Sequence, residues 1–154
     1  MGRSTVDHEA EIKSLVKMAR VMSAAIENEH DKKVAIGMIT DGVFQRKHYH
    51  TGFASVEANN LPPKKQATKE HFYGRKKTAT DLVEMLMKDQ SITDEFLFDF
   101  VRTRCQVHSV TKDQNMQLRE YTKLNPETTW EEAYAVCGIV LEEKVDRRKK
   151  KVDI

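Results

Sequence analysis

The sequence predicts an α+β fold, because helical and strand patterns occur in separate stretches along it. Apolar residues recur at intervals of three and four over 8–27, over 78–87 and again from Thr93, as they do in amphipathic helices. The run 34–40 is short and apolar, and residues 105–109 alternate between apolar and polar, as strands do. With 154 residues, the chain is long enough for one compact domain with a core.

The first half of the chain predicts a helix followed by a hairpin. The helix presents one apolar stripe, which consists of Ile12, Leu15, Val16, Ala19, Met22 and Ile26. The strand 34–40 ends at Asp41-Gly42, a strong turn signal, so Val43 and Phe44 are expected to begin the returning strand. A short helical piece over 54–60 is expected next, and it ends at Leu61-Pro62-Pro63, which cannot continue a helix, before the basic loop that follows.

The second half predicts two paired helices, a strand and two capped helices. Thr93 is a good cap for the second of the pair. The alternation at 105–109 predicts a half-buried strand, and Thr111 with Gln114 forms a capping box that opens the next helix. Asn125-Pro126 ends that helix, and Thr128 or Thr129 caps the last one. We expect a single domain with five parts: an N-terminal helix (1–30), a hairpin and basic loop (31–66), a core (67–125) with a helical insertion (78–103), a C-terminal helix (126–145) and a basic tail (146–154).

Positive charge is concentrated in two segments. Residues 64–77 contain six basic residues and one acidic residue, and residues 144–153 contain six basic and two acidic residues, although the whole chain has a net charge of only +2. Such clustering suits contact with a polyanion such as nucleic acid. Lysine-rich loops and tails that are merely solvated give the same pattern, and for the tail alone the two interpretations are equally good.

The composition indicates an intracellular protein. Cys105 and Cys137 lie far apart in apolar surroundings, as reduced core cysteines do. No apolar run approaches the roughly 18 residues that cross a bilayer. We therefore expect a cytoplasmic protein of a bacterial or phage-infected host cell, with no membrane partner.

The chemistry of the chain centres on two distant segments. Glu70 directly precedes His71 at the end of a short extended run, and Asn115 lies one turn into the helix that Thr111 caps. Hydrolysis of a phosphodiester needs a base near neutral pKa, which imidazole supplies, and a divalent ion, for which carboxylate and amide oxygens are suitable ligands. The start of the capped helix is also a favourable place for a phosphate.

This pattern resembles the HNH endonucleases, also called the ββα-metal or His-Me finger family, in its small phage or homing-type form. The resemblance covers about 70–121 and implies a ββα-metal core elaborated with helices. It implies that His71 is the general base, that Glu70 and Asn115 bind Mg²⁺ or Mn²⁺, and that the substrate is DNA. Two features depart from the family pattern: Glu70 replaces the usual aspartate, and His71 and Asn115 are 44 positions apart because two helices interrupt the motif.

Other positively charged residues are expected to bind the nucleic acid backbone. These are Lys64, Lys65, Arg75, Lys76, Lys77, Arg147 and Arg148. His48 and His50 would face one side of a strand and could also join a metal site, although surface histidines give the same spacing.

Two alternatives to an enzyme stay open. The first is a DNA- or RNA-binding protein without catalysis, which would use the same basic segments and stack bases on aromatic residues such as Tyr49 and Phe72. The second is a small adaptor or inhibitor that binds host proteins through its first helix. A homodimer is compatible with all three functions.

Overall fold

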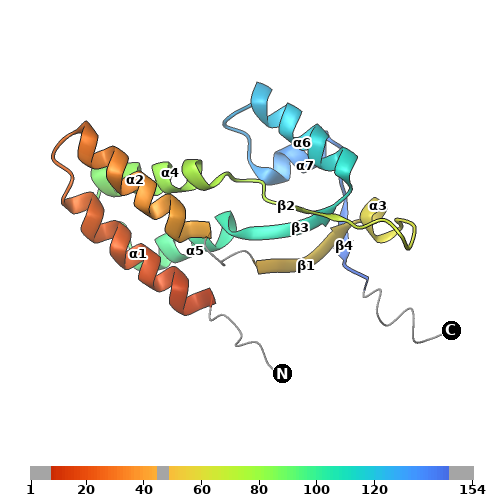
Figure 1. Cartoon of the computed structure of the whole chain (residues 1–154), viewed down its shortest axis with the longest axis horizontal. Coiled ribbons are helices and arrows are strands. Elements are labelled where there is room, and N and C mark those ends of the chain that lie inside the picture. The colour runs from red at the N-terminus through yellow and green to blue at the C-terminus, as the bar shows by residue number, and fades with distance from the viewer. Residues whose placement is uncertain (1–7, 45–48, 146–154) are drawn as a thin grey trace. The chain divides into compact units, whose positions relative to one another are not determined.

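The computed structural model describes residues 8–44 and 49–145 as helices with a small sheet, which confirms the α+β fold class (Figure 1). The elements are α1 (His8–Ala24), α2 (Glu29–Phe44), β1 (Tyr49–Ser55), α3 (Val56–Asn59), β2 (Thr68–Glu70), α4 (Arg75–Lys88), α5 (Asp94–Arg104), β3 (Gln106–Val110), α6 (Lys112–Leu124), α7 (Trp130–Val136) and β4 (Leu141–Glu143). They divide into two compact units, which we call the helical unit (1–49 and 73–106) and the sheet unit (50–72 and 107–154). The expectation of a single domain stays a prediction.

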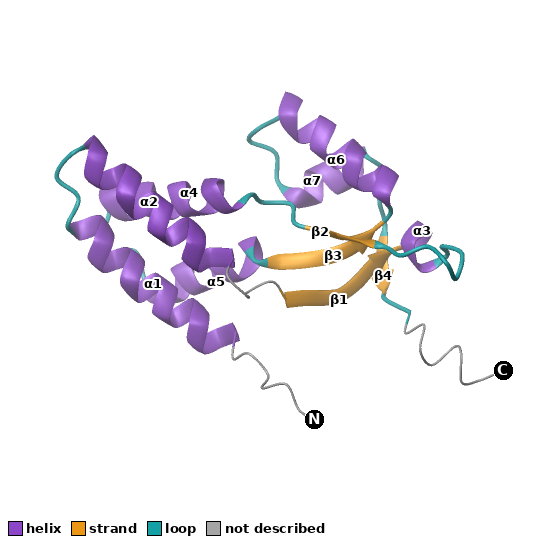
Figure 2. Ribbon diagram, in the orientation of Figure 1, coloured by secondary structure: helices purple, strands orange, loops and turns teal. Residues whose placement is uncertain are grey.

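The helical unit contains α1, α2, α4 and α5. The predicted N-terminal helix is confirmed as α1, and its apolar stripe packs with α4 and α5 around a core that includes Leu82, Val83 and Leu97, each 0% exposed. Arg20 on α1 donates hydrogen bonds to the carbonyl oxygens of Gln90 and Ile92, which lie between α4 and α5. The predicted insertion between the two halves of the core therefore packs with the N-terminal helix (Figure 2).

The hairpin predicted after the first helix is wrong, because residues 29–44 form one helix, α2. The Asn28 side chain accepts a hydrogen bond of 2.8 Å from the Asp31 backbone and so opens the helix. Ala35 and Ile39, four positions apart, are both buried, and α2 packs against α4. Packing of this stripe outweighs the turn signal of Asp41-Gly42, which lies inside the helix.

The sheet unit contains four strands in the order β2-β3-β1-β4. The pairs β1–β4 and β2–β3 are antiparallel, and in the second pair Thr68, Lys69 and Glu70 lie opposite Val110, Ser109 and His108. A core of Val110, Leu118, Ala133, Tyr134 and Ile139 joins β3 to α6 and α7. The Thr129 cap and its capping box with Glu132 open α7 as predicted, and Gly138 follows the helix with a φ of +70°.

The prediction that residues 105–109 form a half-buried strand is wrong in its exposure. Val107, His108, Ser109 and Val110 are all buried, so both faces of β3 are covered, whereas the alternation predicts that only one is. Polar residues on both faces must then find partners inside the protein. His108 and Ser109 both do so, as described below.

Candidate functional site

A pocket of about 390 Å³ lies in the sheet unit between the end of β2 and one side of α6. The residues that line it are Lys69, Glu70, His71, Phe72, Asn115, Leu118, Arg119, Thr122 and Lys123. Glu70, His71 and Asn115, which the sequence predicts to form a site, therefore lie around the same pocket.

The end of β2 determines how Glu70 and His71 reach this pocket. Successive side chains of a strand point to opposite faces, and Glu70 is buried whereas Lys69 is exposed. Lys69 and Glu70 both line the pocket, and burial, followed by the charges of Lys144 and Lys69, lowers the pKa of His50 on β1. Since β2 ends at Glu70, the side chain of His71 is not held to the opposite face of the strand, and it lies exposed at the pocket.

The start of α6 places Asn115. The side chain of Thr111 accepts a hydrogen bond of 3.1 Å from the Gln114 backbone, and Oε1 of Gln114 accepts one of 2.9 Å from the Thr111 backbone. This confirms the predicted capping box. Asn115, Arg119 and Lys123 follow at intervals of four, so they share one side of the helix, and all three line the pocket.

Glu70 is a buried carboxyl group, with 4% of its surface exposed. The hydroxyl of Tyr134 donates a hydrogen bond of 2.6 Å to its Oε1. Desolvation raises the pKa of Glu70 to about 7, although the Tyr134 hydrogen bond and the Arg119 charge act in the opposite direction. The charged form of Glu70 therefore lacks sufficient compensation in the protein alone.

His108 lies opposite Glu70 on β3 and extends this buried polar group. Its Nδ1 lies 3.3 Å from the Tyr134 hydroxyl oxygen. Because that hydroxyl donates its proton to Glu70, Nδ1 of His108 is the donor to the hydroxyl oxygen. Desolvation, helped by the nearby His50, lowers the pKa of His108 to about 4, so its ring is neutral.

The predicted nucleic acid contacts that the structure describes lie away from the pocket. Lys64 and Lys65 lie exposed in the loop before β2, and Arg75, Lys76 and Lys77 form the first turn of α4 in the helical unit. None of these five lines the pocket. Arg147 and Arg148 lie outside the described residues.

His50 has a structural environment that differs from a metal site. Its Nδ1 accepts a hydrogen bond of 2.9 Å from the Gly52 backbone, so its Nε2 carries the proton and donates to Oγ of Ser109 at 2.6 Å. Both ring nitrogens are thus engaged, and Ser109 is an acceptor rather than an activated nucleophile. His48 lies outside the described residues.

Four pocket or pocket-adjacent residues were missed by sequence reasoning: His108, Arg119, Lys123 and Tyr134. The interval of four that relates Arg119 and Lys123 to Asn115 is a signal that could have found them. Tyr134 gave no local signal, because it meets Glu70 from a helix that lies far along the chain.

Comparison with known proteins does not extend the resemblance. No protein-family model, curated protein or solved structure matches the chain.

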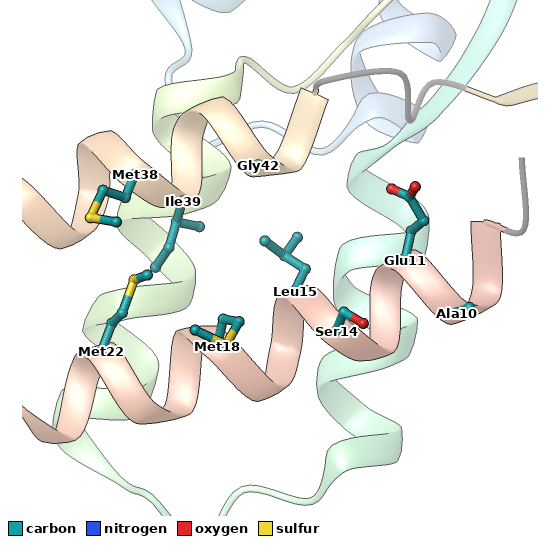
Figure 3. Close-up of a pocket in the computed structure, with 9 residues that line it drawn as sticks. All are labelled: Ala10, Glu11, Ser14, Leu15, Met18, Met22, Met38, Ile39 and Gly42. Carbon is teal, nitrogen blue, oxygen red and sulfur yellow. The ribbon is translucent and has the colours of Figure 1, made fainter.

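A separate apolar groove of about 460 Å³ runs between α1 and α2 in the helical unit (Figure 3). Met18, Met22 and Met38 lie close together along it, and Met18 and Met38 are 47% and 57% exposed. Methionine side chains adapt to irregular partners, and such surfaces are common where proteins bind other proteins.

Within 8–44 and 49–145, no helix has the length and apolar character of a membrane span.

Proposed function

We propose that the pocket is the active site of a metal-dependent DNA endonuclease of HNH type, with His71 as the general base. The observation that carries this proposal is that Glu70, His71 and Asn115 line one pocket although two helices separate them in the chain. The arrangement of the surrounding elements supports it. Strands β2 and β3 pair antiparallel, and α6 follows β3 and packs against β2, which is a strand, strand and helix order like that of a ββα-metal core.

The donor atoms fit a hard divalent cation such as Mg²⁺ or Mn²⁺. Glu70 offers a carboxylate and Asn115 an amide oxygen at the same pocket. Within the described part of the chain, no three His, Cys, Asp or Glu residues group closely enough to hold a metal. Mg²⁺ often has only one or two carboxylate ligands and completes its shell with water and phosphate oxygens. The buried carboxyl of Glu70, whose pKa is raised by desolvation, would be stabilised in its charged form by such a cation.

The reaction consists of in-line attack by water on a DNA phosphate. His71 takes a proton from water, the water oxygen forms a bond to phosphorus, and the bond from phosphorus to the leaving sugar oxygen breaks. The leaving oxygen takes a proton from solvent, and His71 returns its own proton to solvent, to which its side chain is exposed. A bound divalent ion would neutralise charge on the phosphate and on the leaving oxygen. Arg119 and Lys123 would hold the flanking backbone phosphates by their positive charge.

Cleavage of plasmid DNA in the presence of Mg²⁺ or Mn²⁺ tests this function. We expect His71→Ala to lower the cleavage rate at least about 100-fold, as loss of a general base does, without lowering DNA affinity measured in EDTA. His30→Ala is the matched control, because His30 is an exposed histidine on α2 of the helical unit. Equal cleavage rates in His71→Ala and the wild type would refute the assignment of the base.

A nucleic acid-binding protein without catalysis is the second candidate. Helix α4 begins with Arg75, Lys76 and Lys77, has no acidic residue in its first turn and has no side-chain cap at Gly74. Positive side chains at a helix N-terminus are unfavourable by themselves. Lys77 pairs with Asp81 at 3.5 Å, and an anionic partner would further stabilise the positive charge at this helix start. DNA binding without cleavage under any divalent metal would favour this candidate.

An adaptor that binds another protein is the third candidate, and the methionine groove between α1 and α2 favours it. If the protein binds neither DNA nor RNA at low salt, the adaptor is the remaining candidate. The same groove is compatible with a homodimer.

A further inference from the structure

The buried hydrogen bond between Tyr134 and Glu70 connects α7 to the end of β2 in the sheet unit. Helix α7 lies outside the segment that resembles HNH endonucleases, so the resemblance assigns no role to Tyr134. Both partners are buried, with exposures of 3% for Tyr134 and 4% for Glu70. A bond of 2.6 Å in this setting is strong, and it fixes the direction of a carboxyl group that lines the pocket.

The ring of Tyr134 is held as firmly as its hydroxyl. It packs edge-on against Trp130, with ring centroids 5.3 Å apart, and edge-on against His108 at 5.6 Å. Nδ1 of His108 donates to the Tyr134 oxygen, so the hydroxyl proton is directed toward Glu70. The three residues form one chain of polar contacts in the order His108, Tyr134, Glu70.

The Tyr134 hydrogen bond occupies Oε1 of Glu70, and no hydrogen bond found among residues 8–44 and 49–145 occupies Oε2. A carboxylate that can rotate loses part of its affinity for a cation, because binding must first fix its orientation. Groups that hold metal ligands in place commonly contribute 10- to 100-fold to metal affinity.

We propose that Tyr134 is a positioning residue, which orients Glu70 toward a divalent cation in the pocket, and that His108 acts through Tyr134. This inference rests on the proposed function, because it assumes that Glu70 is a metal ligand. It adds a second helix, α7, to β2 and α6, which line the pocket.

The test is Mn²⁺ affinity, measured by calorimetry on the full chain without DNA. Tyr134→Phe removes only the hydroxyl and keeps the ring, and we expect it to weaken Mn²⁺ binding by about 10-fold or more. Tyr121→Phe is the matched control, since Tyr121 packs on the same core, and no hydrogen bond found within 8–44 and 49–145 joins it to Glu70. Tyr134→Phe is expected to lower the free energy of unfolding by about 1–3 kcal/mol, because it leaves Oε1 of Glu70 without its donor, so calorimetry is carried out well below the unfolding transition that thermal unfolding gives for each variant. DNA affinity in EDTA is expected to match the wild type in both variants, which shows that the folded protein and its basic residues are intact.

His108→Phe provides a second variant that keeps a ring against Trp130. We expect it to weaken Mn²⁺ binding less than Tyr134→Phe does, and the double variant to be no weaker than Tyr134→Phe alone, because both act through one hydroxyl. Additive losses would overturn the role of His108.

The outcomes separate the inference from the function on which it rests. If Tyr134→Phe binds Mn²⁺ as tightly as the wild type does, the positioning role is overturned and the nuclease proposal stands. Absence of Mn²⁺ binding and of cleavage in the wild type would overturn both. A loss in Tyr134→Phe that Tyr121→Phe shares would mean that the effect is structural, and this would also overturn the positioning role.

Discussion

Glu70 on β2 lies directly opposite His108 on β3, and the two residues have pKa values shifted in opposite directions by the same cause. Burial disfavours charge on both. The pKa of Glu70 rises to about 7 and that of His108 falls to about 4. Both residues are therefore neutral in the folded protein over a pH range in which both are charged in the unfolded chain.

The first prediction concerns pH and stability without metal. Between about pH 4.5 and 6.5, Glu70 holds a proton that the unfolded chain releases, so its contribution falls as pH rises. His108 lacks a proton that the unfolded chain binds, so its contribution rises with pH. Each slope is about 1.4 kcal/mol per pH unit at most, and the two cancel. We measure the free energy of unfolding by urea in EDTA. In Glu70→Gln only the His108 effect remains, so we expect this free energy to rise with pH relative to the wild type. In His108→Gln only the Glu70 effect remains, so we expect it to fall with pH. Parallel pH profiles in all three proteins would contradict the opposed shifts.

The second prediction concerns the salt dependence of DNA binding. Arg119 and Lys123 lie one turn apart on the pocket side of α6. If each contacts a phosphate, replacing both with glutamine lowers the slope of log affinity against log salt by about 2, since each contact contributes about 0.9. The control is Lys13→Gln with Lys17→Gln, which removes the same charge from exposed positions on α1. Equal slopes for the two double variants in a fluorescence anisotropy titration would exclude a specific role for α6.

The third prediction concerns the polar contact between two helix starts. Oε1 of Gln114 accepts hydrogen bonds from Oγ of Ser55 at 2.6 Å and from the Thr111 backbone, and its Nε2 donates to Glu57 at 2.8 Å. Gln114→Ala breaks all three and leaves the buried Ser55 hydroxyl without this acceptor. We expect a loss of about 2–3 kcal/mol in the free energy of unfolding. Gln117→Ala on the exposed side of α6 should change it by less than about 0.5 kcal/mol.

The fourth prediction tests the helix that replaces the expected hairpin. Gly37 lies within α2, and a Cβ there would meet no atom within 4 Å, so Gly37→Ala should stabilise the protein by about 0.5–1 kcal/mol. Gly138 has a φ of +70°, a conformation that costs alanine about 1–2 kcal/mol. The same substitution should therefore have opposite signs at the two positions. Destabilisation by Gly37→Ala in thermal unfolding would argue against a helix at 29–44.

Sequence reasoning succeeded where the signal was local. The stripe of α1, the Thr93 cap and the Thr111–Gln114 capping box each depend on residues within a few positions of one another. It failed for α2, where a local turn signal at Asp41-Gly42 was outweighed by packing against α4. Tyr134 was missed for the same reason, because its partner Glu70 is distant in the chain. Grouping Glu70, His71 and Asn115 was possible only through a family pattern, since no periodicity spans two intervening helices.

The pairing of β2 with β3 also has a consequence for the order of folding. The two strands are separated by all of α4 and α5, so their alignment closes a long loop, at an entropic cost that local helices do not incur. We expect α4 and α5 to form early and the Glu70–His108 register to form late. The pocket would then be among the last parts of the chain to assemble. During refolding, helix content measured by stopped-flow circular dichroism should return before DNA binding measured by fluorescence anisotropy does.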